Sequence, residues 1–330
     1  MTFSDFVGVA IKALVLVALL MGAFAYMTLF ERKVVARMQN RYGPNRVGPG
    51  GMMQPIADGV KLVFKEQIVP KEAKKFVYAI APCMSLIVAL CAFAVIPVGP
   101  DSLTIFGQHL WVADLNIGIL YVLSVSSLAV YGIALGGWSS GNKYSLMGAI
   151  RSSAQIISYE LALGLALLGV ILVSHTLNMN GIVGAQQNVW FVIPEFLAFV
   201  IYAIAAIAEV NRAPFDLPEA EQELVAGYHT EYSGLRFAMY FAAEYINMVT
   251  VSSIATTLFL GGWRPLLGPD FLGPLWFLLK VILLLFGFVW LRATLPRLKY
   301  DRLMRLGWQV LIPLAILNLV VTSIIVALVS

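Results

Sequence analysis

Residues 153–173 read SAQIISYELALGLALLGVILV, a run of 21 residues in which only Glu160 is charged. At 1.5 Å per residue a helix of this length rises about 30 Å, which matches the hydrocarbon thickness of a bilayer. The rest of the chain has a similar character, since 60% of its 330 residues are hydrophobic and 12% are charged. Soluble globular chains carry about 25% charged residues. The composition therefore places the chain among proteins that cross a membrane several times.

Eight apolar segments are long enough to cross the bilayer as helices. The sequence predicts an all-α fold, and residues 1–330 are expected to form one membrane domain. The first segment is expected to stay in the protein, because it is too long for the apolar part of a signal peptide and no basic stretch precedes it. The predicted spans are residues 6–30, 76–97, 115–137, 153–173, 191–210, 237–260, 274–293 and 308–329.

The loops between these spans alternate in charge. Residues 31–75 hold ten Lys or Arg residues, and the segments 138–152, 211–236 and 294–307 hold two, two and four more. The opposite loops, 98–114, 174–190 and 261–273, contain Arg264 as their one basic residue. Basic residues concentrate in cytoplasmic loops, so both termini are predicted to lie on the non-cytoplasmic side. This distribution also explains the formal charge of +4 without a nucleic-acid partner.

The two long cytoplasmic loops contain patterns typical of short helices. Residues 52–66 read MMQPIADGVKLVFKE and place Ile56, Val60, Val63 and Phe64 on one helical face. Fifteen residues are too few to span, so an amphipathic helix lying along the interface or over a cavity is expected. In the second loop, Asp216 is followed three residues later by Glu219, which is a capping-box pattern. A short helix carrying Glu219, Glu221 and Glu223 is expected there.

Three carboxylates, Glu160, Glu209 and Glu244, fall within or at the end of predicted spans. The predicted topology places all three in the cytoplasmic half of the bilayer, where they can approach one another. An ionised carboxylate in hydrocarbon costs several kcal/mol unless it is paired, hydrated or protonated. Grouped acids at this depth are typical of proton paths. The alternative is structural, with each glutamate paired to a buried cation or reaching the interface.

The other charged residues in the predicted spans do not indicate a functional site. Lys12 and Lys280 are expected to extend to the outer interface or to form pairs, and Glu195 is expected at the interface. Cys83 and Cys91 lie in one apolar run, and the three histidines are far apart. No iron–sulfur, haem or zinc site is therefore expected in this chain.

The chain contains a set of distinctive motifs: Glu31-Arg-Lys, NRYGPNRVG at 40–48, QPIAD at 54–58, WSSGNKYS at 138–145, Ser158-Tyr-Glu160, RAPFDLPEAEQE at 212–223, GYHTEYSG at 227–234 and Ala243-Glu-Tyr245. Together these motifs resemble a family of membrane subunits in proton-pumping NADH–quinone oxidoreductase, respiratory complex I, namely the bacterial H-type and mitochondrial subunit 1 family. The similarity extends from about residue 20 to residue 310.

The resemblance implies a subunit at the joint between the membrane arm and the peripheral arm, in a bacterial inner membrane. Such a protein lines the entrance of the quinone chamber and is not catalytic alone. Quinone is the substrate, while NADH, FMN and the iron–sulfur clusters bind to partner subunits. The implied residues are Glu160, Glu209 and Glu244 for the proton path, Asp216, Glu219, Glu221 and Glu223 for a coupling loop, and Arg32, Arg41, Arg46, Asp58 and Lys61 for the chamber mouth.

Two other functions fit the same features. A cation/proton antiporter also buries carboxylates, but it is expected to have broken helices in matched halves and no partners. A hydrogenase-complex scaffold would use the same fold without quinone, since the Pro214-Phe-Asp stretch suits both families. The partners with which the chain co-purifies distinguish the three.

Overall fold

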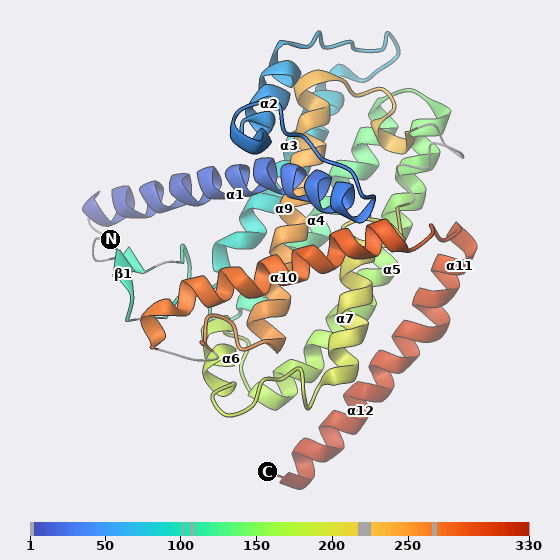
Figure 1. Cartoon of the computed structure of the whole chain (residues 1–330). Helices are drawn as coiled ribbons and strands as arrows, with labels where there is room; N and C mark the ends of the chain where they lie inside the picture. The colour runs from blue at the N-terminus through green and yellow to red at the C-terminus, as the bar shows by residue number, and fades with distance from the viewer. Residues whose placement is uncertain are drawn as a thin grey trace.

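The computed structural model describes residues 3–100, 102–105, 108–109, 111–216, 226–265 and 269–329. The predicted all-α fold is confirmed, with one short hairpin of β1 (Thr104–Ile105) and β2 (Gln108–His109). The α-helices (Figure 1) are α1 (Phe3–Met38), α2 (Gln54–Phe64), α3 (Lys75–Ala92), α4 (Gly118–Ser139), α5 (Lys143–Ser174), α6 (Met179–Ala185), α7 (Phe196–Glu209), α9 (Gly234–Phe259), α10 (Gly273–Thr294), α11 (Tyr300–Arg305) and α12 (Ile312–Val329). Single turns are η1 (Pro49–Gly51), η2 (Phe93–Val95), η3 (Gly227–His229), η4 (Asp270–Leu272) and the π-helical η5 (Leu306–Leu311).

Six helical segments among the described residues are long and apolar enough to cross a membrane, and they match six of the predicted spans. The predicted fifth span becomes α7, which has only 14 residues and rises about 21 Å. Residues 191–195, which contain Pro194, form turns before it. The predicted sixth span becomes α9, a helix of 26 residues that does not reach the same hydropathy. The total of eight spans therefore remains a prediction.

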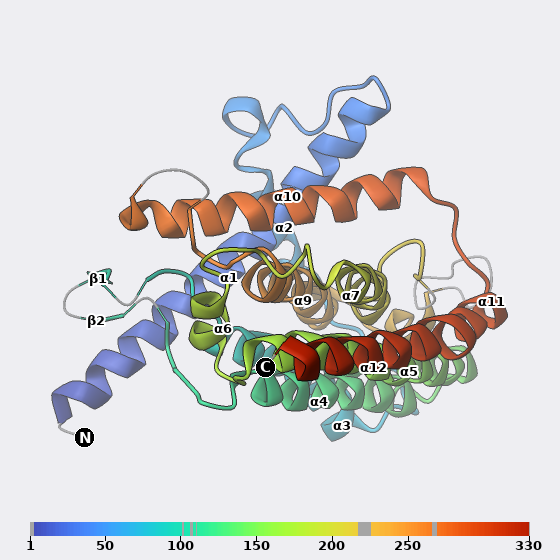
Figure 2. The ribbon, with the colours of Figure 1, turned by 90° about the horizontal axis from the view of Figure 1, so that it is seen from below.

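Helix α9 lies at the centre of the molecule. Every residue from Met248 to Phe259 is buried, and Figure 2 shows α9 and α7 between α10 on one side and α4, α5 and α12 on the other. The serine and threonine hydroxyls in this stretch donate to carbonyls four residues earlier, for example Thr250 to Ile246 at 2.9 Å. Polar residues thus lower the hydropathy of α9 without facing lipid, because protein surrounds them.

The loops gather at two ends of the bundle, as the alternating charge pattern predicts. At the basic end, the Ile68 amide donates to the Ser233 hydroxyl at 3.2 Å, and the Leu298 amide donates to the Pro214 carbonyl at 3.0 Å. At the other end, the Val192 amide donates to the Phe259 carbonyl at 2.9 Å. Which end faces the cytoplasm stays a prediction.

Two charged residues at the less basic end are enclosed by protein. Glu195 is buried, and its carboxylate accepts hydrogen bonds from Asn318 at 2.8 Å and Thr322 at 2.7 Å. Lys280 is also buried. Its ammonium donates to three backbone carbonyls, which belong to Leu260 (2.7 Å), Gly262 (2.9 Å) and Arg264 (2.9 Å). The prediction that Glu195 is interfacial is therefore wrong, because partners from other helices enclose it.

Candidate functional site

A cavity lies among α3, α4, α5, α7 and α9, next to the residues that follow α7. It has about 50 Å³ of space for water, enough for about three to five molecules at 10–15 Å³ each. We call it the carboxylate cavity. It is lined by Ser85, Ser126, Ala129, Ile133, Ile156, Glu209, Val210, Asn211, Tyr228, Tyr240, Ala243, Glu244 and Asn247.

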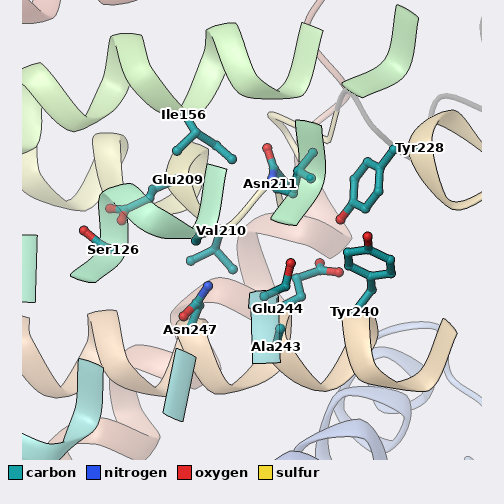
Figure 3. Close-up of a pocket in the computed structure, with 13 residues that line it drawn as sticks. Ser126, Ile156, Glu209, Val210, Asn211, Tyr228, Tyr240, Ala243, Glu244 and Asn247 are labelled. Atoms are coloured by element: carbon teal, nitrogen blue, oxygen red, sulfur yellow. The ribbon is translucent and has the colours of Figure 1, made fainter. Parts of the chain in front are cut away.

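The fold brings two of the predicted acids to this one cavity. Glu209 is the last residue of α7, and Glu244 projects from α9. Figure 3 shows Glu209 beside Ser126 at one end of the cavity and Glu244 beside Tyr240 at the other. Water in the cavity can connect the two carboxylates, because both line the same space.

Glu160 joins the same group through neighbouring serines of α4. Ser127 donates to the Glu160 carboxylate, and Ser126 lines the carboxylate cavity beside Glu209. Glu160 and Glu209 are close enough for their charges to repel each other. A smaller cavity with about 30 Å³ of space for water continues from Glu209 along α9. It shares Ser126, Glu209, Val210 and Asn247 with the carboxylate cavity.

Glu244 is held by an arginine that was not among the predicted site residues. The Arg212 Nε lies 2.7 Å from a carboxylate oxygen of Glu244, and both side chains are almost fully buried. The guanidinium also stacks over the Tyr245 ring, 4.2 Å from its centroid. A terminal nitrogen of Arg212 lies 3.8 Å from a carboxylate oxygen of Glu31. One buried cation therefore faces two carboxylates.

Glu31, near the end of α1, has two further partners. It pairs with Arg292 of α10, and the Tyr245 hydroxyl donates to its second oxygen at 2.8 Å. Glu31 and Arg292 also line a larger cavity of about 590 Å³, which we call the arginine-lined cavity. Its lining is Glu31, Arg32, Val35, Gln39, Arg41, Pro44, Arg292 and Ala293. Arg212 therefore lies between the two cavities and contacts a carboxylate from each.

The structure brings only some of the residues predicted for the chamber mouth to one cavity. Arg32 and Arg41 line the arginine-lined cavity. The carboxylate of Asp58 in α2 forms an ion pair with Arg32 at 2.7 Å, and its other oxygen lies 3.8 Å from the Lys61 ammonium. Arg46 is exposed, and it is not part of this lining.

The predicted amphipathic helix is present as α2, with bounds Gln54–Phe64. Its apolar face is exposed in this chain, from 51% for Val60 to 84% for Phe64. The face is thus free to meet lipid, a quinone tail or another protein of the complex. Of the predicted coupling loop, Asp216 is described and partly buried. Glu219, Glu221 and Glu223, with the short helix expected there, lie outside the described residues.

A buried aromatic cluster adjoins the carboxylate cavity, and its histidine lies in η3, before α9 begins. His229, in η3, is 5% exposed and packs against the rings of Tyr228, Phe237 and Tyr240. Burial among these rings lowers the pKa of His229 to about 3, because a desolvated imidazolium is unfavourable. The imidazole is therefore neutral at physiological pH.

Three residues of this site, Glu31, Arg212 and Arg292, were not predicted as site residues, although the sequence positions of two of them indicated a place at the end of a span. Glu31 directly follows the first predicted span, and Arg292 closes the seventh. Glu31 was noted only as part of the Glu31-Arg-Lys motif, and Arg292 was not considered. Within the described residues, no group of three His, Cys, Asp or Glu side chains is arranged to hold a metal ion.

Comparison with known proteins identifies the same family as the sequence motifs. Residues 11–323 match the family model described as NADH dehydrogenase. The chain is 55% identical to the H-type subunit of NADH-quinone oxidoreductase from Thermomicrobium roseum, over 94% of each chain. It is 54% identical to NADH-quinone oxidoreductase subunit 8 of Thermus thermophilus, over 97% of this chain and 87% of that protein. It is 51% identical to the second H-type subunit of NADH-quinone oxidoreductase from Geobacter metallireducens, over 98% and 96%.

Proposed function

Because the chain belongs to the NADH dehydrogenase family and is a membrane subunit of NADH–quinone oxidoreductase, we propose that it lines the quinone entrance and links quinone reduction to proton pumping. The chain belongs to an oxidoreductase complex and is not catalytic alone. In this proposal Glu160, Glu209 and Glu244 carry the protons. NADH, FMN and the iron–sulfur clusters bind to partner subunits, and quinone is the substrate.

The observation that carries the proposal is the position of Arg212 between two carboxylates. It pairs with Glu244 in the carboxylate cavity and faces Glu31 in the arginine-lined cavity. Charge that appears in the arginine-lined cavity changes the field at Glu31 and so draws Arg212 towards or away from Glu244. A buried carboxylate that loses part of its cation binds a proton more readily. Reduction of a quinone creates such a change, since it needs two protons.

Transfer between the acids is supported by their surroundings. Glu209 and Glu244 line one space with room for water, and Glu160 is coupled to Glu209 by repulsion. Coupled acids titrate as a group, so a proton gained by one lowers the proton affinity of the others. The group can therefore pass a proton in response to a change at Glu244.

The quinone side of the proposal depends on Arg32, Arg41, Arg46, Asp58 and Lys61, together with the exposed apolar face of α2. A charge on this face, as in Val60→Asp, should slow reduction of a long-tailed quinone by NADH more than that of a truncated one. NADH oxidation by ferricyanide, which needs no chamber, serves as the control. Equal losses with long and short tails would remove α2 from the quinone route.

The coupling loop, Asp216 with Glu219, Glu221 and Glu223, is proposed to face the peripheral arm in the assembled complex. We place the chain in a bacterial inner membrane with both termini periplasmic. Single cysteines replacing Gln187 and Lys143, both exposed, test this orientation. An impermeant thiol reagent added to intact cells should label the first and not the second.

The two rival functions are less well supported. An antiporter would work without partners, and a hydrogenase scaffold would not need quinone, whereas all three relatives are named as subunits of NADH–quinone oxidoreductase. Co-purification with NADH dehydrogenase subunits, rather than hydrogenase subunits or none, is the expected result.

The main experiment replaces Glu244 by glutamine, which keeps the size and much of the hydrogen bonding but cannot titrate. We expect an assembled complex that pumps fewer protons per electron. Glu195→Gln is the matched control, because Glu195 is also enclosed by protein but is bonded to Asn318 and Thr322, and it should pump as the wild type does. Wild-type pumping by Glu244→Gln, or equal losses in both variants, would contradict the proposal.

A further inference from the structure

A surface cleft opens at the basic end of the bundle. It has about 360 Å³ of space and is open on one side. Ser140, directly after α4, lies at its inner wall, and the Glu231 carboxylate at its rim accepts a hydrogen bond from Asn142 at 2.7 Å. Its lining is Pro70, Lys71, Glu72, Ser140, Gly141, Asn142, Lys143 and Glu231.

A row of buried hydroxyl groups begins at this inner wall. The hydroxyls of Ser139 and Tyr232 are 3.4 Å apart. The Ser140 hydroxyl donates to the Gly136 carbonyl at 2.8 Å, and the Tyr232 hydroxyl approaches the same carbonyl at 3.4 Å. The rings of Tyr232 and Tyr240 pack edge to face, with centroids 5.0 Å apart. All four side chains are buried. Each hydroxyl both donates and accepts hydrogen bonds, so the row can pass a proton from one oxygen to the next.

The inner end of the row is the carboxylate cavity. Tyr240 lines that cavity together with Glu244, and Figure 3 shows the two side chains next to each other. The Tyr240 hydroxyl donates to the Gly132 carbonyl at 3.0 Å, and that of Tyr232 makes longer bonds, 3.3 and 3.4 Å, to the carbonyls of Tyr78 and Gly136. Rotation of either hydroxyl exchanges a carbonyl acceptor for the next oxygen of the row.

The surface of α4 leaves space for the two tyrosine hydroxyls to meet. A Cβ at Gly136 would collide with the Tyr240 hydroxyl and would lie 3.6 Å from that of Tyr232. Both hydroxyls therefore converge on one glycine. Any larger residue at this position would push Tyr240 out of the row.

From this geometry we propose that Ser139, Ser140, Tyr232 and Tyr240 form a proton inlet from the surface cleft to the carboxylate cavity. The proton enters from water in the cleft. Each hydroxyl oxygen takes up a proton and releases its own to the next, and the last proton arrives at Glu244, directly or through cavity water. No electrons are transferred. The inlet rests on the proposed proton-carrying role of Glu244 and adds the route by which protons reach it.

The first test removes single hydroxyls, with Tyr232→Phe and Tyr240→Phe. The rings keep their packing, which includes the stack of Tyr232 on Tyr78. Protons pumped per electron should fall towards the level of Glu244→Gln, with the NADH–ferricyanide rate unchanged. Tyr159→Phe is the matched control. It also loses a buried tyrosine bond to a carbonyl, that of Leu303 at 2.9 Å, but lies off the row and should pump normally.

The variants separate the inlet from the function on which it rests. If Glu244→Gln lowers pumping and both phenylalanine variants pump normally, the inlet is wrong and the proposed function stands. If Glu244→Gln also pumps normally, the proposed function itself fails. A loss of pumping in Tyr159→Phe as large as in Tyr240→Phe would mean that the tyrosines act only through packing, and it would overturn the inlet.

A second test blocks the cleft after assembly, so that folding plays no part. A cysteine replaces Lys71 at the cleft, in a chain whose Cys83 and Cys91 are changed to alanine, and a bulky thiol reagent is then added. Labelling should lower pumping per electron, whereas labelling a cysteine at the exposed Lys65 outside the cleft should not. Normal pumping by the fully labelled Lys71→Cys complex, or failure of the reagent to reach that cysteine, would overturn the inlet.

Discussion

Helix α7 has a glutamate at each end, and the two have different surroundings. Glu195, just before the helix, has each carboxylate oxygen bonded to a neutral donor, one from Asn318 and one from Thr322. Glu209, the last residue, lines two cavities and is repelled by Glu160. The first carboxylate is fixed by direct bonds. The second faces space for water and a like charge.

The difference teaches that burial of a charge does not by itself indicate a proton path. A buried charge whose bonding capacity is filled by protein is a structural element, and its removal leaves unsatisfied partners. A buried charge beside water-sized space and another acid can change its protonation at lower cost. Lys280, which donates to three carbonyls, belongs with Glu195, whereas Glu244 belongs with Glu209.

The largest effect on stability is expected where the bonding is most complete. Lys280→Met removes the donor from the carbonyls of Leu260, Gly262 and Arg264. An unsatisfied buried acceptor costs about 1–3 kcal/mol, so the total loss should be about 3 kcal/mol or more. The yield and thermal stability of the solubilised complex measure it, and the fraction that assembles should pump normally per electron.

Lys12→Met is the control for this variant. Lys12 lies within α1 and is partly exposed, so its loss should leave stability almost unchanged. Reduced pumping per electron in assembled Lys280→Met, with normal stability, would place Lys280 among the functional charges and break the comparison.

A smaller effect on stability is expected from the hydroxyl groups beside the two α7 glutamates, and it should differ between the two sites. Thr322→Val leaves one oxygen of Glu195 without its donor, in a site filled by protein, and should destabilise the chain by about 1–3 kcal/mol. Ser126→Ala removes the hydroxyl that lies beside Glu209 in the carboxylate cavity, but cavity water can replace it. Its thermal stability should therefore stay near that of the wild type. Equal destabilisation by both variants would show that Glu209 is bonded as rigidly as Glu195.

Much of the fold was predictable from single segments of sequence. Six spans and the amphipathic helix α2 follow from hydrophobic length and helical period, which are local properties. The departures have local causes too. Pro194 lies in the turns before α7, which shorten the fifth predicted span, and the buried polar residues of α9 lower its hydropathy although the helix is central.

The candidate site was less predictable, because its contacts join distant parts of the chain. Depth along a span was enough to single out Glu160, Glu209 and Glu244, but not their partners. Glu31 and Arg292 are separated by 261 positions, and Glu195 and Thr322 by 127. Nothing in one sequence signals such pairs, so Arg212 was counted as a loop charge and Glu195 was misplaced. The roles of all these residues in proton transfer remain predictions.

The smallest effect concerns pH, and it compares the two ends of the molecule. The end with the carboxylate cavity also holds His229, whose pKa is lowered to about 3 by burial, against an ordinary value near 6.5. Below pH 6.5 the unfolded chain binds a proton that folded His229 does not, so stability is complete above pH 6.5 and falls with the pH towards 3. Between pH 7 and pH 5.5 the loss should be about 1 kcal/mol. His229→Phe fills the aromatic site without a titratable group. It should remove about 1 kcal/mol of the stability loss between pH 7 and pH 5.5, which would be measured as a smaller fall of the thermal midpoint between these two pH values. An unchanged sensitivity would mean that groups elsewhere set the response to acid, and that this end of the molecule is no more sensitive to pH than the end that holds Glu195.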